Sequence, residues 1–202
     1  MLQYKTIEPA TLQLLKDLQS LPILKETHLV GGTALALQLG HRKSVDLDLF
    51  GSIPFTSDEI RDALSEGHSL TTIKESKNIN IYLIDGIKVA FVNYKYAWID
   101  SPVHGDGFSL AGIKDIAAMK VAAIVGRGTK KDFIDLFSLL KLFPLQEILN
   151  LYLQKYPDGS IFLAMKSLSY FEDAEQDPMP EMLMDATWED VKDGIREALN
   201  SL

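Results

Sequence analysis

Apolar and polar positions recur with two different periods in the first half of the chain. Between residues 9 and 20 the leucines recur at helical spacing, which predicts a helix. The segment Val45 to Phe50 alternates apolar and acidic residues with a period of two, which is typical of a half-buried strand. The dipeptide Asp85-Gly86 favours a type I′ hairpin between two apolar runs. Further strands are predicted at 28–30, 70–73, 79–84 and 87–94.

Helix start and stop signals complete this pattern. Thr33 to Leu39 is helix-prone, and Gly40 ends it. Thr56-Ser-Asp-Glu59 is a capping box that predicts a helix through about Glu66, and Thr187-Trp-Glu-Asp190 is a second one that begins a terminal helix. Additional helices are predicted at 110–125, 130–142, 145–155 and 161–171.

The two halves of the chain therefore differ in architecture. Residues 1–105 mix strands with helices, whereas residues 106–202 are almost entirely helical in pattern, apart from an acidic, proline-containing linker at 172–180. The loop Ser101 to Gly107 is the best candidate for the boundary. We predict an α+β protein, with a mixed β-sheet and flanking helices followed by a C-terminal helical bundle.

Composition narrows the class of protein. The chain has no cysteine, which excludes disulfides, thiolate metal sites and cysteine nucleophiles. It has no secretory signal pattern and no apolar run long enough to cross a bilayer, so we expect a cytoplasmic protein without a membrane partner. A formal net charge of −8 gives no overall attraction to nucleic acid, which would need a local basic patch.

The segment from Leu29 to Phe50, LVGGTALALQLGHRKSVDLDLF, carries the most informative pattern. A predicted strand ends at Gly31-Gly32, and a helix follows directly, so backbone N–H groups are free to approach a phosphate. Asp46 and Asp48 are two residues apart on a predicted strand and face the same side. A divalent cation such as Mg²⁺ would relieve their repulsion and bind phosphate oxygens as well.

Each part also has a structural interpretation without chemistry. Gly31-Gly32-Thr33 fits an ordinary strand-to-helix turn, and acids at alternate positions usually form the wet face of an exposed strand. Their order within one strand, glycine turn, helix and strand unit favours a Mg·NTP site over a coincidence. The chain has no P-loop sequence, no nucleophile elbow and no histidine pair with zinc-ligand spacing.

The same residues resemble the AbiEii/AbiGii-type toxin nucleotidyltransferases, which are minimal nucleotidyltransferases of the DNA polymerase β-like superfamily. The family pattern of a G-G/S-T/S turn, a helix and R-x-S-x-D-x-D corresponds to Gly31-Gly32-Thr33 and Arg42-Lys-Ser44-Val-Asp46-Leu-Asp48. A later family pattern, K-x-x-A followed by K/R-D-x-x-D-L, corresponds to Lys120-Val-Ala-Ala123 and Lys131-Asp132-Phe-Ile-Asp135-Leu136. The resemblance covers about residues 29–140.

This resemblance implies a nucleotidyltransferase-like core over 1–105 and a role for each matching residue. Asp46 and Asp48 would be catalytic and hold Mg²⁺. Lys120 would be catalytic and contact phosphate, and Asp132 or Asp135 would orient the site. The remaining matching residues would bind the nucleotide or hold the carboxylate strand in place: Gly31, Gly32, Thr33, Arg42 and Ser44. Asp135 has apolar neighbours in the sequence, which favours a position inside the fold, and Asp132 also suits a helix start.

One departure from the family leaves the activity open. Relatives often carry a third carboxylate on a strand that reads K-V-D-F-V, whereas this chain has Lys88-Val-Ala90-Phe-Val92. By this resemblance, an intact enzyme would move a nucleotide from an NTP to a hydroxyl of tRNA or protein. It would act as the toxin of a toxin–antitoxin or phage-defence system, with a cognate antitoxin as its partner. The alternative is a catalytically weakened protein that binds a nucleotide or a partner.

Overall fold

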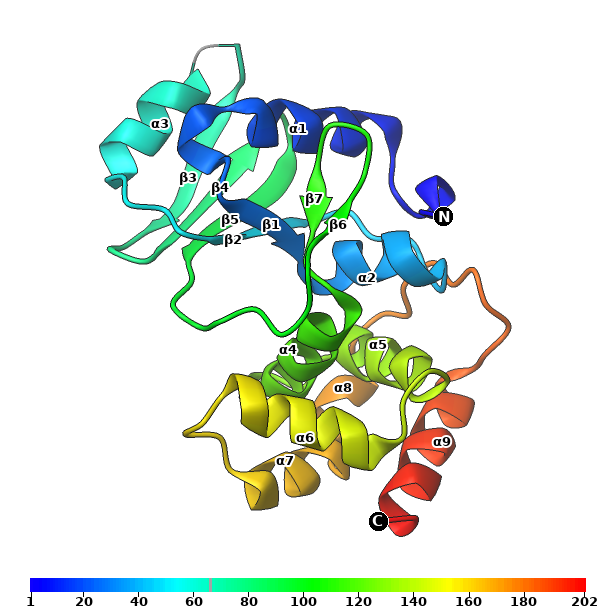
Figure 1. Ribbon diagram of the computed structural model, residues 1–202. Coiled ribbons are helices and arrows are strands. Elements are labelled where there is room, and N and C mark those ends of the chain that lie inside the picture. The colour runs from blue at the N-terminus through cyan, green and yellow to red at the C-terminus, as the bar shows by residue number, and fades with distance from the viewer. Residues whose placement is uncertain (66) are drawn as a thin grey trace.

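The computed structural model describes residues 1–65 and 67–202, and a mixed sheet of seven strands occupies its N-terminal part (Figure 1). The strand order is β3-β4-β5-β2-β1-β7-β6. Strand β2 pairs antiparallel with β1 and parallel with β5, and β1 pairs parallel with β7. The strands are β1 (Thr27–Val30), β2 (Leu47–Gly51), β3 (Leu70–Glu75), β4 (Ile79–Ile84), β5 (Ile87–Asn93), β6 (Val103–His104) and β7 (Ser109–Leu110).

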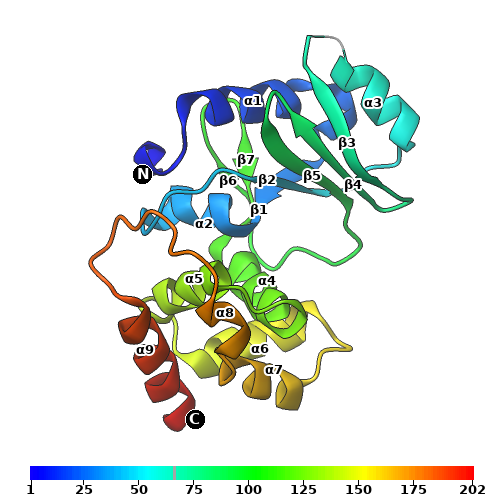
Figure 2. The ribbon, with the colours of Figure 1, turned by 180° about the vertical axis from the view of Figure 1, so that it is seen from behind.

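Helices surround the sheet and form the C-terminal part (Figures 1 and 2). They are α1 (Pro9–Ser20), α2 (Gly31–Leu39), α3 (Ser57–Ser65), α4 (Ile113–Gly126), α5 (Lys130–Leu140), α6 (Leu145–Lys155), α7 (Ile161–Leu168), α8 (Glu172–Glu175) and α9 (Trp188–Asn200), with short 3₁₀ helices at Tyr4–Thr6 and Pro22–Leu24. The predicted α+β class, with a mixed sheet followed by a helical bundle, is confirmed.

Most local signals produced the predicted elements. Helices α1 and α6 have the predicted ends, and Gly40 ends α2 in the left-handed conformation, with φ of 73°. The hairpin turn is confirmed, because Asp85 and Gly86 both have positive φ, at 51° and 82°. Both capping boxes form their reciprocal hydrogen bonds. The predicted end of the third helix near Glu66 lies outside the described residues.

Several boundaries differ from the prediction. Strand β2 begins at Leu47, so Asp46 immediately precedes the strand. Helix α4 begins at Ile113 instead of 110, and α7 ends at Leu168 because the chain turns before the four-residue helix α8. The segment expected to be a loop contains β6, and β7 follows it, so the sheet continues to Leu110. The domain boundary at 105 stays a prediction.

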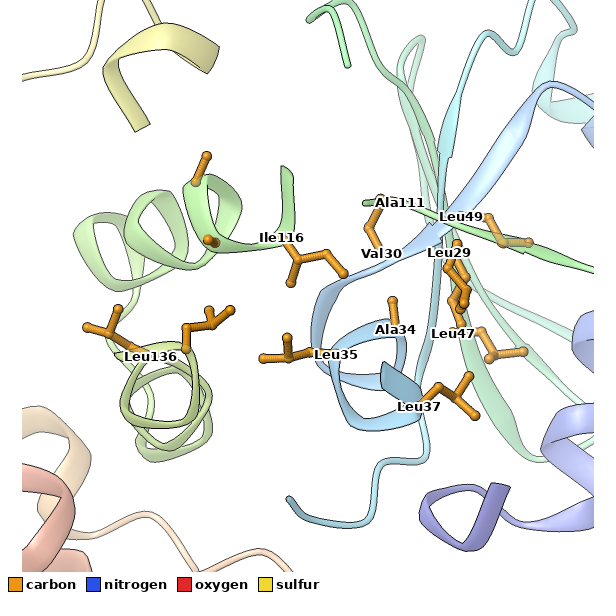
Figure 3. Packing of buried hydrophobic residues seen from close by; sticks show 14 of the residues in the cluster. Leu29, Val30, Ala34, Leu35, Leu37, Leu47, Leu49, Ala111, Ile116 and Leu136 are labelled. Atoms are coloured by element: carbon orange, nitrogen blue, oxygen red, sulfur yellow. The ribbon is translucent and has the colours of Figure 1, made fainter. Parts of the chain in front are cut away.

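Helix α2 joins the sheet to the helical part. Its sequence is apolar on every side, and such a helix is stable only when it is buried all round. Figure 3 shows Ala34 and Leu37 directed toward the sheet, whereas Leu35 lies toward Ile116 of α4 and Leu136 of α5. All of these side chains are fully buried. One continuous core therefore holds the start of α2 in a defined position relative to both the sheet and the bundle.

No single helix among the described residues has the length and apolar character needed to cross a membrane. Helices α5 and α6 are long and apolar enough only when they are counted as one segment, and the chain bends by 116° between them.

Candidate functional site

The start of α2 and the middle of β2 meet at Gly31. Gly31 has a φ of 69°, a conformation that glycine adopts without steric cost. A Cβ atom at this position would lie 2.6 Å from Oδ2 of Asp48. Because Gly31 has no side chain, the Asp48 carboxylate approaches the backbone where the first N–H groups of α2 lack intrahelical partners. Val30, the N-cap of the helix, has no side-chain acceptor for them.

The strand register places the candidate carboxylates on the face of the sheet opposite the buried leucines. Leu47 and Leu49 are fully buried, whereas Asp48 is half-buried and lies in register between Val30 and Ala90. Asp46 is also half-buried, just before the strand. Alternation along the chain therefore puts Asp46 and Asp48 on one side.

Burial raises the pKa of Asp48 above its usual range despite the opposing positive charge of Lys120, and the negative charge of Asp46 adds to the rise. The carboxylates thus interact electrostatically, and they lie within reach of cationic groups from α4. A positive charge supplied by a ligand would favour the ionised form of Asp48.

The segment before β2 is fixed by hydroxyl groups. The buried Thr33 hydroxyl donates a hydrogen bond to the backbone carbonyl of Asp46 and lies 2.8 Å from the Ser44 hydroxyl. The Ser44 N–H also donates to the carbonyl of Thr6. Both Thr33 and Ser44 therefore hold the carboxylate segment against α2. Their contact with phosphate stays a prediction.

Gly32 makes room for the side chain of Arg42. A Cβ atom at Gly32 would collide with Nη2 of Arg42 and lie 3.4 Å from Oδ2 of Asp135. Arg42 is buried and donates to Asp135 with both Nε, at 2.7 Å, and Nη2, at 2.9 Å. This bidentate pair connects the turn after α2 with α5.

Asp135 is the centre of a buried charge network. Its carboxylate accepts hydrogen bonds from Arg42 and from Nε2 of His41, at 2.7 Å, and forms an ion pair with Lys120 at 2.6 Å. Although burial opposes ionisation, the charges of Lys120 and Arg42 hold the pKa of Asp135 well below its usual range. The prediction that Asp135 lies inside the fold is confirmed.

Asp132 extends the network toward solvent. It accepts hydrogen bonds from Lys120 at 3.1 Å, from Nε of Arg127 at 2.9 Å and from the Thr129 hydroxyl at 2.7 Å. Burial opposes its ionisation, but Lys120 and Arg127 together lower its pKa to about 2. The Lys120 side chain is only 4% exposed, and its two carboxylate partners keep its pKa raised despite burial.

The structure thus brings the candidate residues into two adjoining groups. Asp46 and Asp48 lie beside the glycine turn, whereas Lys120, Asp132 and Asp135 are paired with one another behind it. Thr33, in the first turn of α2, and Ser44 contact the segment of the first group, whereas Arg42, after α2, contacts Asp135 of the second. The catalytic, metal-binding and phosphate-binding roles of all these residues stay predictions.

The sequence interpretation assigned no role to two members of this network. His41 precedes Arg42 and shares its carboxylate partner, which only the three-dimensional contact reveals. Arg127 follows α4 and lies outside the motifs that the sequence identified. Its side chain is 65% exposed, yet its bonds to Asp132 fix its direction, and it supplies positive charge to Asp48.

Ala90 lies directly opposite Asp48 on the parallel neighbour β5, so it occupies the position next to the candidate metal ligands. Within residues 1–65 and 67–202 no group of three or more His, Asp or Glu side chains is placed to hold a metal ion. The donors that are present do fit Mg²⁺, which binds through one or two carboxylates together with substrate phosphates. Among the described residues no side chain caps the start of α2, so its first backbone N–H groups could bind those phosphates.

A mixed sheet that presents acidic residues beside a glycine turn, with a helical bundle behind it, defines a nucleotidyltransferase-like protein. A sequence profile of the family described as nucleotidyl transferase AbiEii toxin, type IV TA system, matches residues 13–201. The chain belongs to this family.

Individual proteins are similar to this chain in sequence or in fold. An uncharacterized protein of Aquifex aeolicus (strain VF5) is 37% identical over 185 residues, which cover 89% of each chain. The nucleotidyltransferase toxin MenT4 of Mycobacterium tuberculosis H37Rv has the same fold, with a TM-score of 0.63 at 17% identity over 96% of this chain and 82% of its own. A candidate nucleotidyltransferase of H. pylori gives a TM-score of 0.60 at 20% identity over 96% of this chain and 97% of its own.

Proposed function

We propose that this protein transfers a nucleotide from an NTP to a hydroxyl acceptor in a Mg²⁺-dependent reaction, as the toxin of a toxin–antitoxin system. The observation that carries the proposal is the approach of the Asp48 carboxylate to Gly31 at the start of α2. A cation between Asp46 and Asp48 and phosphates at the N-terminus of the helix would neutralise each other at this place. Family membership supports nucleotidyl transfer as the reaction.

In the transfer, the acceptor oxygen forms a bond to the α-phosphorus of the NTP, and the bond from that phosphorus to the bridging oxygen of the β-phosphate breaks. Pyrophosphate leaves, and the hydroxyl proton of the acceptor passes to solvent water. Bound Mg²⁺ would supply Lewis-acid stabilisation of the phosphoryl oxygens. The backbone N–H groups of Gly31 and Gly32 would bind phosphate, and Lys120 and Arg127 would place positive charge beside the departing pyrophosphate.

The alternative is a protein that binds a nucleotide or a partner without efficient transfer. One observation favours it: Ala90, in register with Asp48, offers no carboxylate to receive the proton of the acceptor. Calorimetry with Mg·NTP, combined with a search for product across RNA and protein acceptors, separates the two. Binding without any product supports the alternative. Gain of transfer in an Ala90→Asp variant would show that only the missing acid limits the reaction.

The main experiment follows incorporation of label from each of the four α-³²P NTPs into tRNA and into protein. We expect Asp46→Ala to lower the rate at least about 100-fold while thermal unfolding stays near that of the wild type. Asp193→Ala, which changes an exposed carboxylate paired with Arg196 on α9, is the matched control and keeps full activity. Transfer that survives Asp46→Ala would refute the mechanism. The labelled product identifies tRNA or protein as the acceptor.

The family description also supports a cognate antitoxin. The test is growth of cells that express this chain alone, with the neighbouring gene, or as Asp46→Ala. We expect growth arrest by the chain alone, and normal growth in the other two cases. Arrest that persists in Asp46→Ala would separate toxicity from nucleotidyl transfer.

A further inference from the structure

A cavity of about 380 Å³ opens beside the C-terminal end of α4, where that helix packs against α7. Residues of α4, α7 and α8 line it, and Figure 2 shows these helices below the sheet, with α8 next to α4. The volume lies at the lower end of the range for small-molecule sites, roughly 300–1,000 Å³. It therefore suits a group the size of a nucleoside rather than a complete NTP with its triphosphate.

Arg127 connects this cavity with the candidate site. It lines the cavity, and its Nε and Nη2 atoms are held by Asp132 at 2.9 and 3.1 Å. In the described part of the chain Nη1 makes no hydrogen bond, so one edge of the guanidinium can receive a ligand. The Asp132 bonds fix this edge in advance, which lowers the entropy lost on binding. Asp132 also bonds Lys120, and Lys120 pairs with Asp135, so a continuous set of contacts leads from Arg127 toward the glycine turn. The Oδ2 atom of Asp135 would lie 3.4 Å from a Cβ atom at Gly32.

The cavity walls provide apolar surface for a base and hydrogen-bonding groups for a base and ribose. Leu163 and the half-exposed ring of Tyr170 offer apolar and aromatic surface, and Ser167 and Asp173 offer hydrogen-bonding groups. The Tyr170 hydroxyl lies 3.3 Å from Oε2 of Glu172 and 3.4 Å from Oδ1 of Asp173, and Oδ2 of Asp173 remains an acceptor among the described contacts.

Asp173 repels phosphate, whereas Arg127 and Lys166, which also lines the cavity, attract it. Because Asp132 fixes the Arg127 guanidinium, we expect a nucleotide to bind with its phosphates toward Arg127 and its base toward Tyr170.

We propose that the cavity between α4, α7 and α8 binds the base and ribose of the nucleotide, with Arg127 directing the phosphates toward Gly31 and Asp48. The inference rests on the proposed function and assigns its substrate recognition to the C-terminal helices.

The test compares binding of Mg²⁺ complexes of the four NTPs and of inorganic tripolyphosphate, by calorimetry at constant ionic strength. Tripolyphosphate has the phosphates but no base. We expect the wild type to bind at least one NTP at least about tenfold more tightly than tripolyphosphate, because stacking on an aromatic ring contributes on this scale. Equal affinities for tripolyphosphate and all four NTPs would overturn the proposal.

Variants locate the base. We expect Tyr170→Ala to weaken NTP binding about tenfold or more and to leave tripolyphosphate binding unchanged. Tyr4→Ala is the matched control, since Tyr4 is 43% exposed, close to the 48% of Tyr170, but lies at the N-terminus. Gly126→Phe should fill the cavity, because an added Cβ at Gly126 meets no atom within 4 Å. It should also weaken only NTP binding, with unchanged thermal unfolding as the check on folding.

The outcomes separate this inference from the proposed function. If Tyr170→Ala weakens NTP binding but the wild type forms no transfer product with any acceptor, the cavity assignment stands and the proposed reaction fails. If transfer occurs and depends on Asp46, while Tyr170→Ala and Gly126→Phe bind all NTPs as the wild type does, the cavity assignment fails alone.

Discussion

Replacement of Asp132 by asparagine tests the buried charge network behind the candidate site. The carboxylate is fully buried and accepts hydrogen bonds from Lys120 and Arg127, and its pKa falls from an ordinary 3.8 to about 2. This difference corresponds to roughly 2 kcal/mol of stabilisation of the folded state by the ionised group. We expect Asp132→Asn to lower the free energy of unfolding at pH 7 by about 2 kcal/mol, because Lys120 also loses part of its compensation.

The sign of the pH dependence follows from the direction of the pKa change. Because the folded-state pKa is below the unfolded-state value, the stabilisation is complete above about pH 5 and declines as the pH falls toward 2. At pH 3 roughly half of it should be lost. The difference in stability between wild type and Asp132→Asn should therefore be smaller at pH 3 than at pH 7.

Urea unfolding followed by circular dichroism at both pH values measures these quantities. Asp193→Asn is the control, since the exposed pair of Asp193 with Arg196, at 2.8 Å, should contribute no more than about 1 kcal/mol. The account of this network would be refuted if Asp132→Asn lowered the free energy of unfolding by less than about 0.5 kcal/mol at pH 7. It would also be refuted if the loss relative to the wild type were equal at both pH values.

Two further substitutions probe the position of α2. Gly31→Ala should destabilise the protein by about 1–3 kcal/mol, because a φ of 69° is strained for alanine. It should also weaken Mg·NTP binding, because the new Cβ displaces the Asp48 carboxylate. Normal NTP binding measured by calorimetry would contradict this prediction. Leu35→Ala should cost about 2–5 kcal/mol in urea unfolding, because it opens a cavity between α2, α4 and α5; a loss below about 1 kcal/mol would show that the contact is not tightly packed.

The parts of the fold that the sequence predicted well are those with local causes. The hairpin at Asp85-Gly86 and the cap at Thr187 depend on residues within a few positions, so their signals are complete in a short window. Strands β6 and β7 were missed because each has only two residues, and β7 exists through its pairing with the distant strand β1, where Leu110 lies beside Leu29. Such a pairing has no period to detect.

In the candidate site, too, the sequence predicted the features with local causes and missed the contacts between distant residues. The glycine turn and the spacing of Asp46 and Asp48 predicted that these residues meet, and the contact of Asp48 with Gly31 agrees. The pairing of Lys120 with Asp132 and Asp135, and the participation of His41, arise from the packing of α4 and α5 against α2. The sequence motifs identified Lys120, Asp132 and Asp135 as candidates but could not indicate that they bind one another, and they gave no role to His41.

Binding of a metal–nucleotide complex at the Asp48 carboxylate is the claim on which the rest depends, and electron paramagnetic resonance with Mn²⁺ in place of Mg²⁺ measures it directly. In the presence of a non-hydrolysable NTP analogue, we expect Asp48→Asn to raise the dissociation constant of the Mn²⁺–nucleotide complex at least about tenfold relative to wild type and Asp193→Asn, because a neutral amide is a weaker ligand than a carboxylate. The same dissociation constant for all three proteins would contradict the account.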